Sequence, residues 1–197
     1  MVNVEHSTLT GASLHEPKGV GAASSGQVYV ANGAGSGVWT SISTSVNPFG
    51  TQFFHVRDEK ANTTDSQILT GGIWNKRDLN TVKTNEISGA SVASSQISLP
   101  VGIYYCIASA IANGGTGGNL QKIRLRNITD GTSLLVGLSG VVSAAAGSME
   151  STLAGRFTLG GTKTIELQHW SSAGSGAQST DSGEAEVYAD VMIWKVG

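Results

Sequence analysis

The sequence contains one cysteine, Cys106, among its 197 residues. This excludes an intrachain disulfide and a metal site built on clustered cysteines. Charged residues are scarce, at 13% of the chain against about 25% in an average globular protein. The net charge is −2 and basic residues form no run, which argues against binding to a nucleic-acid backbone.

Long hydrophobic runs are also missing. No stretch approaches the roughly 20 consecutive apolar residues that span a bilayer, so we expect no insertion into a membrane. The N-terminal residues have neither the basic segment nor the apolar segment of a secretion signal, so we expect none there.

What the chain has in quantity is small residues, including 27 glycines, which favour short strands and tight turns over helices. Apolar residues recur throughout, which argues against disorder. The pattern changes near Pro48, because turn-rich sequence precedes it and long alternating segments follow. We therefore predict two parts, residues 1–46 and residues 47–197.

The first part is predicted to be an extended arm with a short β-hairpin. Pro17 and the neighbouring glycines interrupt residues 10–19, and residues 27–31 and 38–42 have the composition of two short strands. A lone hairpin is marginally stable in water. The arm should therefore need a partner surface, or copies of itself, to be ordered.

The second part is predicted to be all-β. Apolar and polar residues alternate in several segments after residue 52, and Asp130-Gly131 is a strong signal for a two-residue hairpin turn. Eight or more strands with closely spaced turns are typical of a sandwich or a barrel.

Alternation also assigns the faces of these strands. The residues expected in the core are Ile123, Leu125, Ile165, Leu167, Ala185, Val187, Ala189, Val191 and Ile193. The opposite faces of the segments 122–128 and 163–168 are basic or polar and are expected to be solvated.

Two other segments place bulky residues on the predicted non-core face. These residues are Tyr104, Cys106, Tyr188, Met192 and Trp194. Large side chains on an outer face indicate a second burial surface, usually between subunits. The alternative is that they pack under their own loops.

Residues 96–105, 155–169 and 187–194 resemble three strand segments of the tumour-necrosis-factor-like jelly rolls, a group that includes complement globular heads. The resemblance covers about residues 53–196. It implies a ten-stranded jelly-roll sandwich and a homotrimer, with the sheet of the first, third, sixth and last strands facing the trimer axis. We therefore expect the five bulky residues of the preceding paragraph to form the trimer interface.

Residues 9–19 and 27–33 are similar to the N-termini of small virion proteins of tailed bacteriophages. This implies that the protein is made in the bacterial cytoplasm and attached to the outer surface of a virion. The arm would then bind the major capsid protein or another virion protein. The expected attachment residues are Leu9, Leu14, His15, Pro17, Tyr29 and Trp39.

Three functions compete for such a chain. The first is a capsid decoration protein or head fibre, which the absence of a shaft between arm and head favours over a tail position. The second is a tail-fibre or tail-tip adhesin that binds a host-surface glycan. The third is a trimeric lectin-like domain with no role in a virion.

Catalysis has no visible site, and we expect neither an enzyme nor a cofactor. The four histidines are scattered, no Gly-x-Ser-x-Gly turn precedes a helix, and the glycine-rich stretches lack the strand and helix of a nucleotide loop. Asp130, Asp181 and Glu184 have oxygens that suit a hard cation, but they lack ligand spacing, so no metal site is expected.

One segment has the chemistry of a ligand loop. Residues 169–184 join His169 and Trp170 to a run of small polar residues and to Asp181. An aromatic ring beside small polar groups can hold a sugar by stacking and hydrogen bonding. The alternative is an apical loop in which Trp170 covers the end of the core.

Overall fold

The computed structural model describes residues 23–31, 37–41, 52–114, 118–142 and 147–197. Contacts between residues divide the chain into two units, Met1–Val46 and Asn47–Gly197. The described residues form fourteen β-strands and no helix, so none of them could cross a membrane as a helix.

The described residues of the first unit form an antiparallel hairpin of β1 (Gln27–Ala31) and β2 (Gly37–Ser41). Tyr29 lies opposite Trp39, and their ring centroids are 5.3 Å apart. The other side of the hairpin carries Val28, Val30 and Val38, all exposed in this unit. Each side of this small ribbon is therefore apolar.

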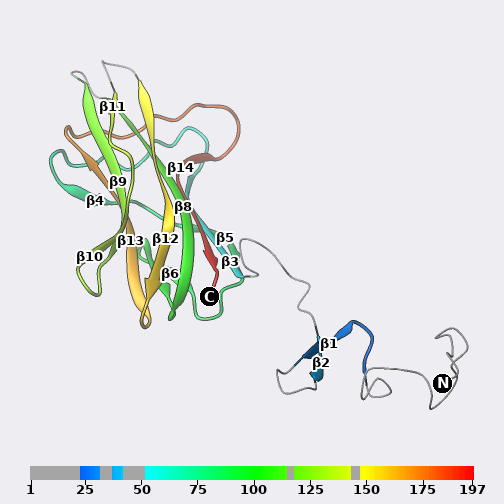
Figure 1. The fold of residues 1–197 in the computed structure, drawn as a ribbon. Coiled ribbons are helices and arrows are strands. Elements are labelled where there is room, and N and C mark those ends of the chain that lie inside the picture. The colour runs from blue at the N-terminus through cyan, green and yellow to red at the C-terminus, as the bar shows by residue number, and fades with distance from the viewer. Residues whose placement is uncertain (1–22, 32–36, 42–51, 115–117, 143–146) are drawn as a thin grey trace, which may run out of the picture. The chain divides into compact units, whose positions relative to one another are not determined.

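The second unit is a sandwich of two antiparallel sheets (Figure 1). The five-stranded sheet has the order β12 (Ser148–Leu159), β8 (Gly102–Asn113), β14 (Glu186–Lys195), β3 (Gln52–Lys60) and β5 (Thr81–Asn85). Its strands come from distant parts of the chain, because the chain crosses repeatedly from one sheet to the other.

The seven-stranded sheet has the order β10 (Thr132–Val136), β9 (Asn119–Asn127), β13 (Lys163–Ser171), β7 (Gln96–Leu99) and β6 (Ser91–Ala93). Two short strands lie off this path, β11 (Gly140–Val142) on β9 and β4 (Trp74–Lys76) on β13. The ten strands on the two continuous paths have the interleaved order of a jelly roll. The predicted fold, a ten-stranded jelly roll with a short hairpin before it, is confirmed.

The core lies between the sheets and is built from the inward residues of alternating strands. Ile123 and Leu125 of β9, with Ile165 and Leu167 of β13, are fully buried. They belong to the same apolar cluster as Ile193 of β14. Complete burial of such a side chain stabilises the fold by about 1.5–3 kcal/mol. For β9 and β13, and for Ile193 of β14, the predicted core faces are correct.

The face assignment of β8 is wrong. Tyr104 and Cys106 are completely buried in the core, while Tyr105 and Ile107 point outward. Both faces of this strand are apolar, so alternation alone cannot tell which one is inside. Pairing decides it, because Cys106 lies opposite the buried Ile193 of β14.

The prediction for the start of β14 is also wrong. Ala185 precedes the strand and is exposed, and Val187 is exposed at 42%. The register shifts between Val187 and Ala189, where β14 bulges against β3. A bulge reverses the inward side of a strand. Tyr188 is consequently buried, whereas the remaining expected core residues of this strand, from Ala189 onward, do face the core.

Candidate functional site

An aromatic row crosses the outer face of the five-stranded sheet. Trp194 of β14 lies between Phe53 of β3 and Tyr105 of β8 in the strand register. Trp194 stacks on Phe53 with ring centroids 4.9 Å apart, and the centroid of Tyr105 is 6.4 Å away. All three rings are half-buried in the single chain.

A second and a third row run parallel to it. Met192 lies between His55 and Ile107, and Asp190 lies between Arg57 and Ser109. We call the three rows together the aromatic face; its residues are Phe53, His55, Arg57, Tyr105, Ile107, Ser109, Asp190, Met192 and Trp194.

The charged groups of the aromatic face are paired with one another. The Nε of Arg57 donates to Oδ2 of Asp190 at 2.9 Å, and Nε2 of His55 lies 2.7 Å from Oδ1 of the same carboxylate. Glu59 continues the chain of charges, with Oε1 3.7 Å from Nη1 of Arg57 and 3.1 Å from Nζ of Lys83. Internal pairing lowers the cost of covering these groups with another surface.

A hollow extends the aromatic face toward the edge formed by β12. Its lining includes Ile107, Val136, Leu138, Thr152 and Ala154. Leu138 is exposed at 76% and Val136 at 56%. The edge of the sheet therefore carries apolar surface that the single chain leaves uncovered.

The predicted interface residues divide between two environments. Met192 and Trp194 lie on the aromatic face, as expected. Tyr104 and Cys106 are in the core, and burial raises the pKa of both side chains. Tyr188 packs beneath a loop, where its hydroxyl donates to the carbonyl oxygen of Thr64 at 2.8 Å.

Sequence reasoning missed Phe53, Tyr105 and Ile107, which complete the aromatic face. The signal was present in the strand that contains Phe53-Phe54-His55. Two adjacent phenylalanines must point to opposite faces of a strand, so one of them had to lie on the outer side. Phe54 is the buried member of the pair.

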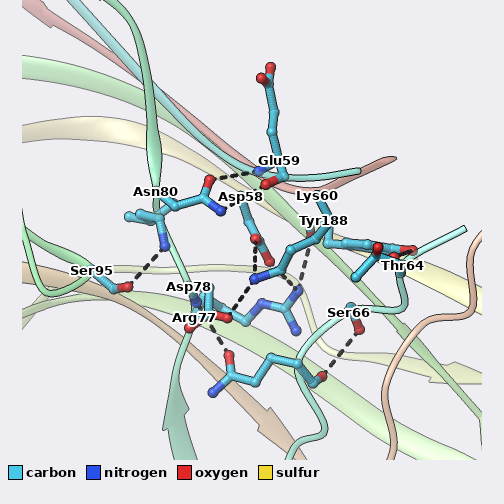
Figure 2. A network of polar contacts seen from close by, with 12 residues as sticks. Asp58, Glu59, Lys60, Thr64, Ser66, Arg77, Asp78, Asn80, Ser95 and Tyr188 are labelled. Carbon is cyan, nitrogen blue, oxygen red and sulfur yellow. Dashed lines mark hydrogen bonds and ion pairs between the residues drawn. The ribbon is translucent and has the colours of Figure 1, made fainter. Parts of the chain in front are cut away.

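A buried network of polar groups lies beside Tyr188 (Figure 2). Asp58 and Arg77 are both fully buried, with Nη2 of Arg77 3.8 Å from Oδ2 of Asp58. The Nζ of Lys60 lies 3.2 Å from Oδ1 of Asp58 and 2.9 Å from Asp78. Burial raises the pKa of Asp58, outweighing the opposing effect of Lys60. Arg77 also donates to the carbonyl oxygen of Tyr188 at 3.2 Å.

The residues of the predicted ligand loop lie on two different elements, β13 and the loop that follows it. His169 and Trp170 belong to β13 and point to opposite sides of the sheet. His169 is fully buried, and burial, followed by the charge of Arg77, lowers its pKa to about 3. Asp181 is exposed in the following loop and accepts a hydrogen bond from Nδ2 of Asn62 at 3.1 Å.

The predicted attachment residues are only partly within the described structure. Leu9, Leu14, His15 and Pro17 lie outside the described residues. Tyr29 and Trp39 share one side of the β1–β2 hairpin. Within the described ranges, no three side chains of His, Cys, Asp or Glu group in a way that could hold a metal ion.

Comparison with known proteins gives no relative by sequence: no family model matches, and no curated protein matches. Among solved structures, murine APRIL matches with 12% identity and a TM-score of 0.45, over 74% of this chain and 98% of that chain. The globular domain of zebrafish complement 1qA matches with 13% identity and a TM-score of 0.46, over 74% and 97%. These matches assign no family, and the jelly-roll fold is established by the strand order of the two sheets.

Proposed function

We propose that the protein is a homotrimeric structural protein of the virion surface, either a capsid decoration protein or a head fibre. Residues 1–46 anchor it to the capsid, and the jelly roll projects outward. The aromatic face forms the contact between the subunits of the trimer. It presents half-buried Phe53, Tyr105 and Trp194 in one row, and the charged groups of the neighbouring rows are already paired with one another.

The apolar hollow at the β12 edge favours a closed ring of three subunits. A threefold contact is heterologous, so each subunit must offer two unlike patches that fit one another. The aromatic row containing Trp194 is one such patch. The apolar hollow lined by Val136 and Leu138 is the other. A stable contact of this kind covers about 800 Å² on each partner.

The hairpin supports the anchoring role of the arm. Two strands cannot enclose a core, and here Tyr29 and Trp39 occupy one side while Val28, Val30 and Val38 occupy the other. An apolar ribbon of this size gains stability by lying on a partner. The similarity of residues 9–19 and 27–33 to phage virion proteins favours a virion protein as that partner.

Deletion of residues 1–46 tests the anchoring role of these residues separately from trimer formation by the jelly roll. We expect the remaining jelly roll to form trimers in light scattering and to fail to sediment with capsids. The full chain should form trimers and also sediment with capsids. Sedimentation of the deleted form with capsids would refute the anchoring role. A monomeric deleted form would show that the arm, and not the aromatic face, holds the trimer.

Adhesion to a host-surface glycan is a second candidate function. It is favoured by the outer face of the seven-stranded sheet, where Trp74 and Trp170 lie opposite one another. The same head can serve both roles, because the two sheets have their outer faces on opposite sides of the sandwich.

A further inference from the structure

The outer face of the seven-stranded sheet gathers cations around two tryptophans. In the strand register Trp170 of β13 lies between Trp74 of β4 and Lys122 of β9. One step along the strands, Gln168 lies between Lys76 and Arg124. We call this surface the basic face; its residues are Trp74, Lys76, Lys122, Arg124, Arg126 and Trp170.

The cations of the basic face are not neutralised by close ion pairs within the described ranges. Lys76, Lys122, Arg124 and Arg126 form no ion pair with any residue in the part of the chain that the structure describes. By contrast, Arg57, Lys60 and Lys83 of the five-stranded sheet and Arg77 of the buried network each lie beside an acidic side chain. This concentration of positive charge stands out in a chain whose net charge is −2.

The carboxylate of Glu166 lies beside these cations and is already occupied by two amides. Oε1 of Glu166 accepts from the side chain of Gln96 at 2.8 Å, and its Oε2 accepts from Gln168 at 2.6 Å. Glu166 lies opposite Arg126 in the register but makes no ion pair with it. The ammonium of Lys76 donates to the carbonyl oxygen of Ser94 at 2.7 Å. Lys122, Arg124 and Arg126 are therefore the cations most available to an external anion.

Arg124 is held in place before any ligand arrives. Its guanidinium carbon lies 4.1 Å from the centroid of the Trp74 ring, and its Nε donates to Oε1 of Gln168 at 2.8 Å. An arginine fixed in this way loses less conformational entropy when it binds an anion. Its Nη1 makes a further, long hydrogen bond of 3.5 Å to the hydroxyl of Ser133, so its terminal nitrogens can still donate to a ligand.

We propose that the basic face binds a linear acidic polysaccharide whose sugar rings carry carboxylates. The half-buried indole ring of Trp170 offers a flat apolar surface to the C–H face of a sugar ring, with polar groups beside it for the hydroxyls. The ring of Trp74 instead holds the guanidinium of Arg124. Lysine and arginine supply charge-assisted hydrogen bonds to the carboxylates.

The spacing suits an extended polyanion. Lys122, Arg124 and Arg126 alternate along β9, and alternate residues of an antiparallel strand lie about 6.8 Å apart. The three cations therefore form a row along one face of β9. A nucleic acid could follow the same row, but its closely spaced phosphates would bring far more charge to a chain that is itself negative overall.

The inference rests on the proposed function in one respect, which is that the basic face is accessible in the assembled particle. If the aromatic face forms the trimer contact, the basic face lies on the opposite side of each sandwich and remains open to solvent. A protein on the outside of a virion meets cell-surface polysaccharide there. Binding itself can be measured on the purified full chain, so it stands or falls independently of attachment to capsids.

Immobilised polygalacturonate, hyaluronate and polysialate test the proposal at low ionic strength, with dextran as the neutral polymer and oligothymidylate as the nucleic acid. We expect retention on at least one acidic polysaccharide, none on dextran, and weaker retention on oligothymidylate. Trp170→Ala and Arg124→Gln should each weaken binding about tenfold, as removal of a central aromatic or arginine contact does.

Lys83→Gln is the matched control, because it removes the same charge from β5 of the other sheet. Its binding should equal that of the unaltered chain, and the melting temperature of every variant shows whether it is folded. If the protein binds none of the three acidic polymers, the proposal is overturned. Equal retention on dextran would overturn it as well. Tighter binding to oligothymidylate would make the surface a nucleic-acid site, and unaltered binding by folded variants would place the site elsewhere.

Discussion

Trp194 stacks on Phe53 across the β14–β3 ladder, with ring centroids 4.9 Å apart and an angle of 26° between the rings. The pair lies on the outer side of its sheet, whereas the stacked rings of Tyr104 and Phe157 lie within the core. Aromatic stacking of the first pair therefore stabilises a surface and not the interior of the single chain.

Trp194→Glu should convert the proposed trimer to monomers. A carboxylate in the centre of an apolar contact cannot be desolvated without a partner. Light scattering measures the change, and circular dichroism confirms that the fold is retained. Trp170→Glu is the control, because it makes the same replacement on the other sheet and should leave the trimer intact. A trimeric Trp194→Glu variant would remove this residue from the contact.

Tyr188→Phe should leave the trimer unchanged and lower the free energy of unfolding by about 1 kcal/mol, the usual contribution of one hydrogen bond. The lost bond runs from the tyrosine hydroxyl to the carbonyl oxygen of Thr64. Urea denaturation measures the loss. Dissociation of the trimer by this variant would contradict the buried position of the side chain.

Removal of one partner from the buried pair of Asp58 and Arg77 should be strongly destabilising. Asp58→Leu leaves the guanidinium of Arg77 uncompensated in the interior, at a cost of about 3–5 kcal/mol. The double variant Asp58→Leu/Arg77→Leu should recover much of that loss in denaturation experiments. A double variant no more stable than Asp58→Leu would show that neither charge depends on the other.

Stability should fall with acid through His169. Burial lowers its pKa from 6.5 to about 3, so between these values the unfolded chain binds a proton that the folded chain does not. The stabilisation is complete above pH 6.5 and is lost as the pH falls toward 3, at roughly 1.4 kcal/mol per pH unit. His169→Phe should flatten the pH dependence of the unfolding free energy by that slope. Parallel curves for the two proteins would contradict the assignment.

The fold was predictable because most strands differ plainly between their two faces. In β9, Ile123 and Leu125 alternate with Lys122, Arg124 and Arg126, and only one of the two faces can be buried. The same contrast was not available in β8, where apolar residues occupy both faces. Burial does alternate along β8, but the residue types do not indicate which of its two faces is buried.

The candidate surfaces were less predictable than the fold, for related reasons. A bulge within β14 turned Tyr188 inward, and no residue pattern marks its position. The basic row of β9 was recognisable as a row, but its meaning depended on β4, a three-residue strand that brings Trp74 beside Trp170. Short strands with no alternation of their own are placed by pairing alone.

Residue order and alternation by themselves determined that residues after about 52 form an all-β sandwich or barrel and that a short hairpin precedes it, because burial of one face per strand is a local requirement. The tertiary structure decided which aromatic residues are buried and which meet on a surface. Those choices depend on register between strands far apart in the chain, such as Trp194 beside Phe53 and Trp170 beside Trp74. Side chains from distant segments become neighbours only when the ladders form, and no local pattern records that pairing.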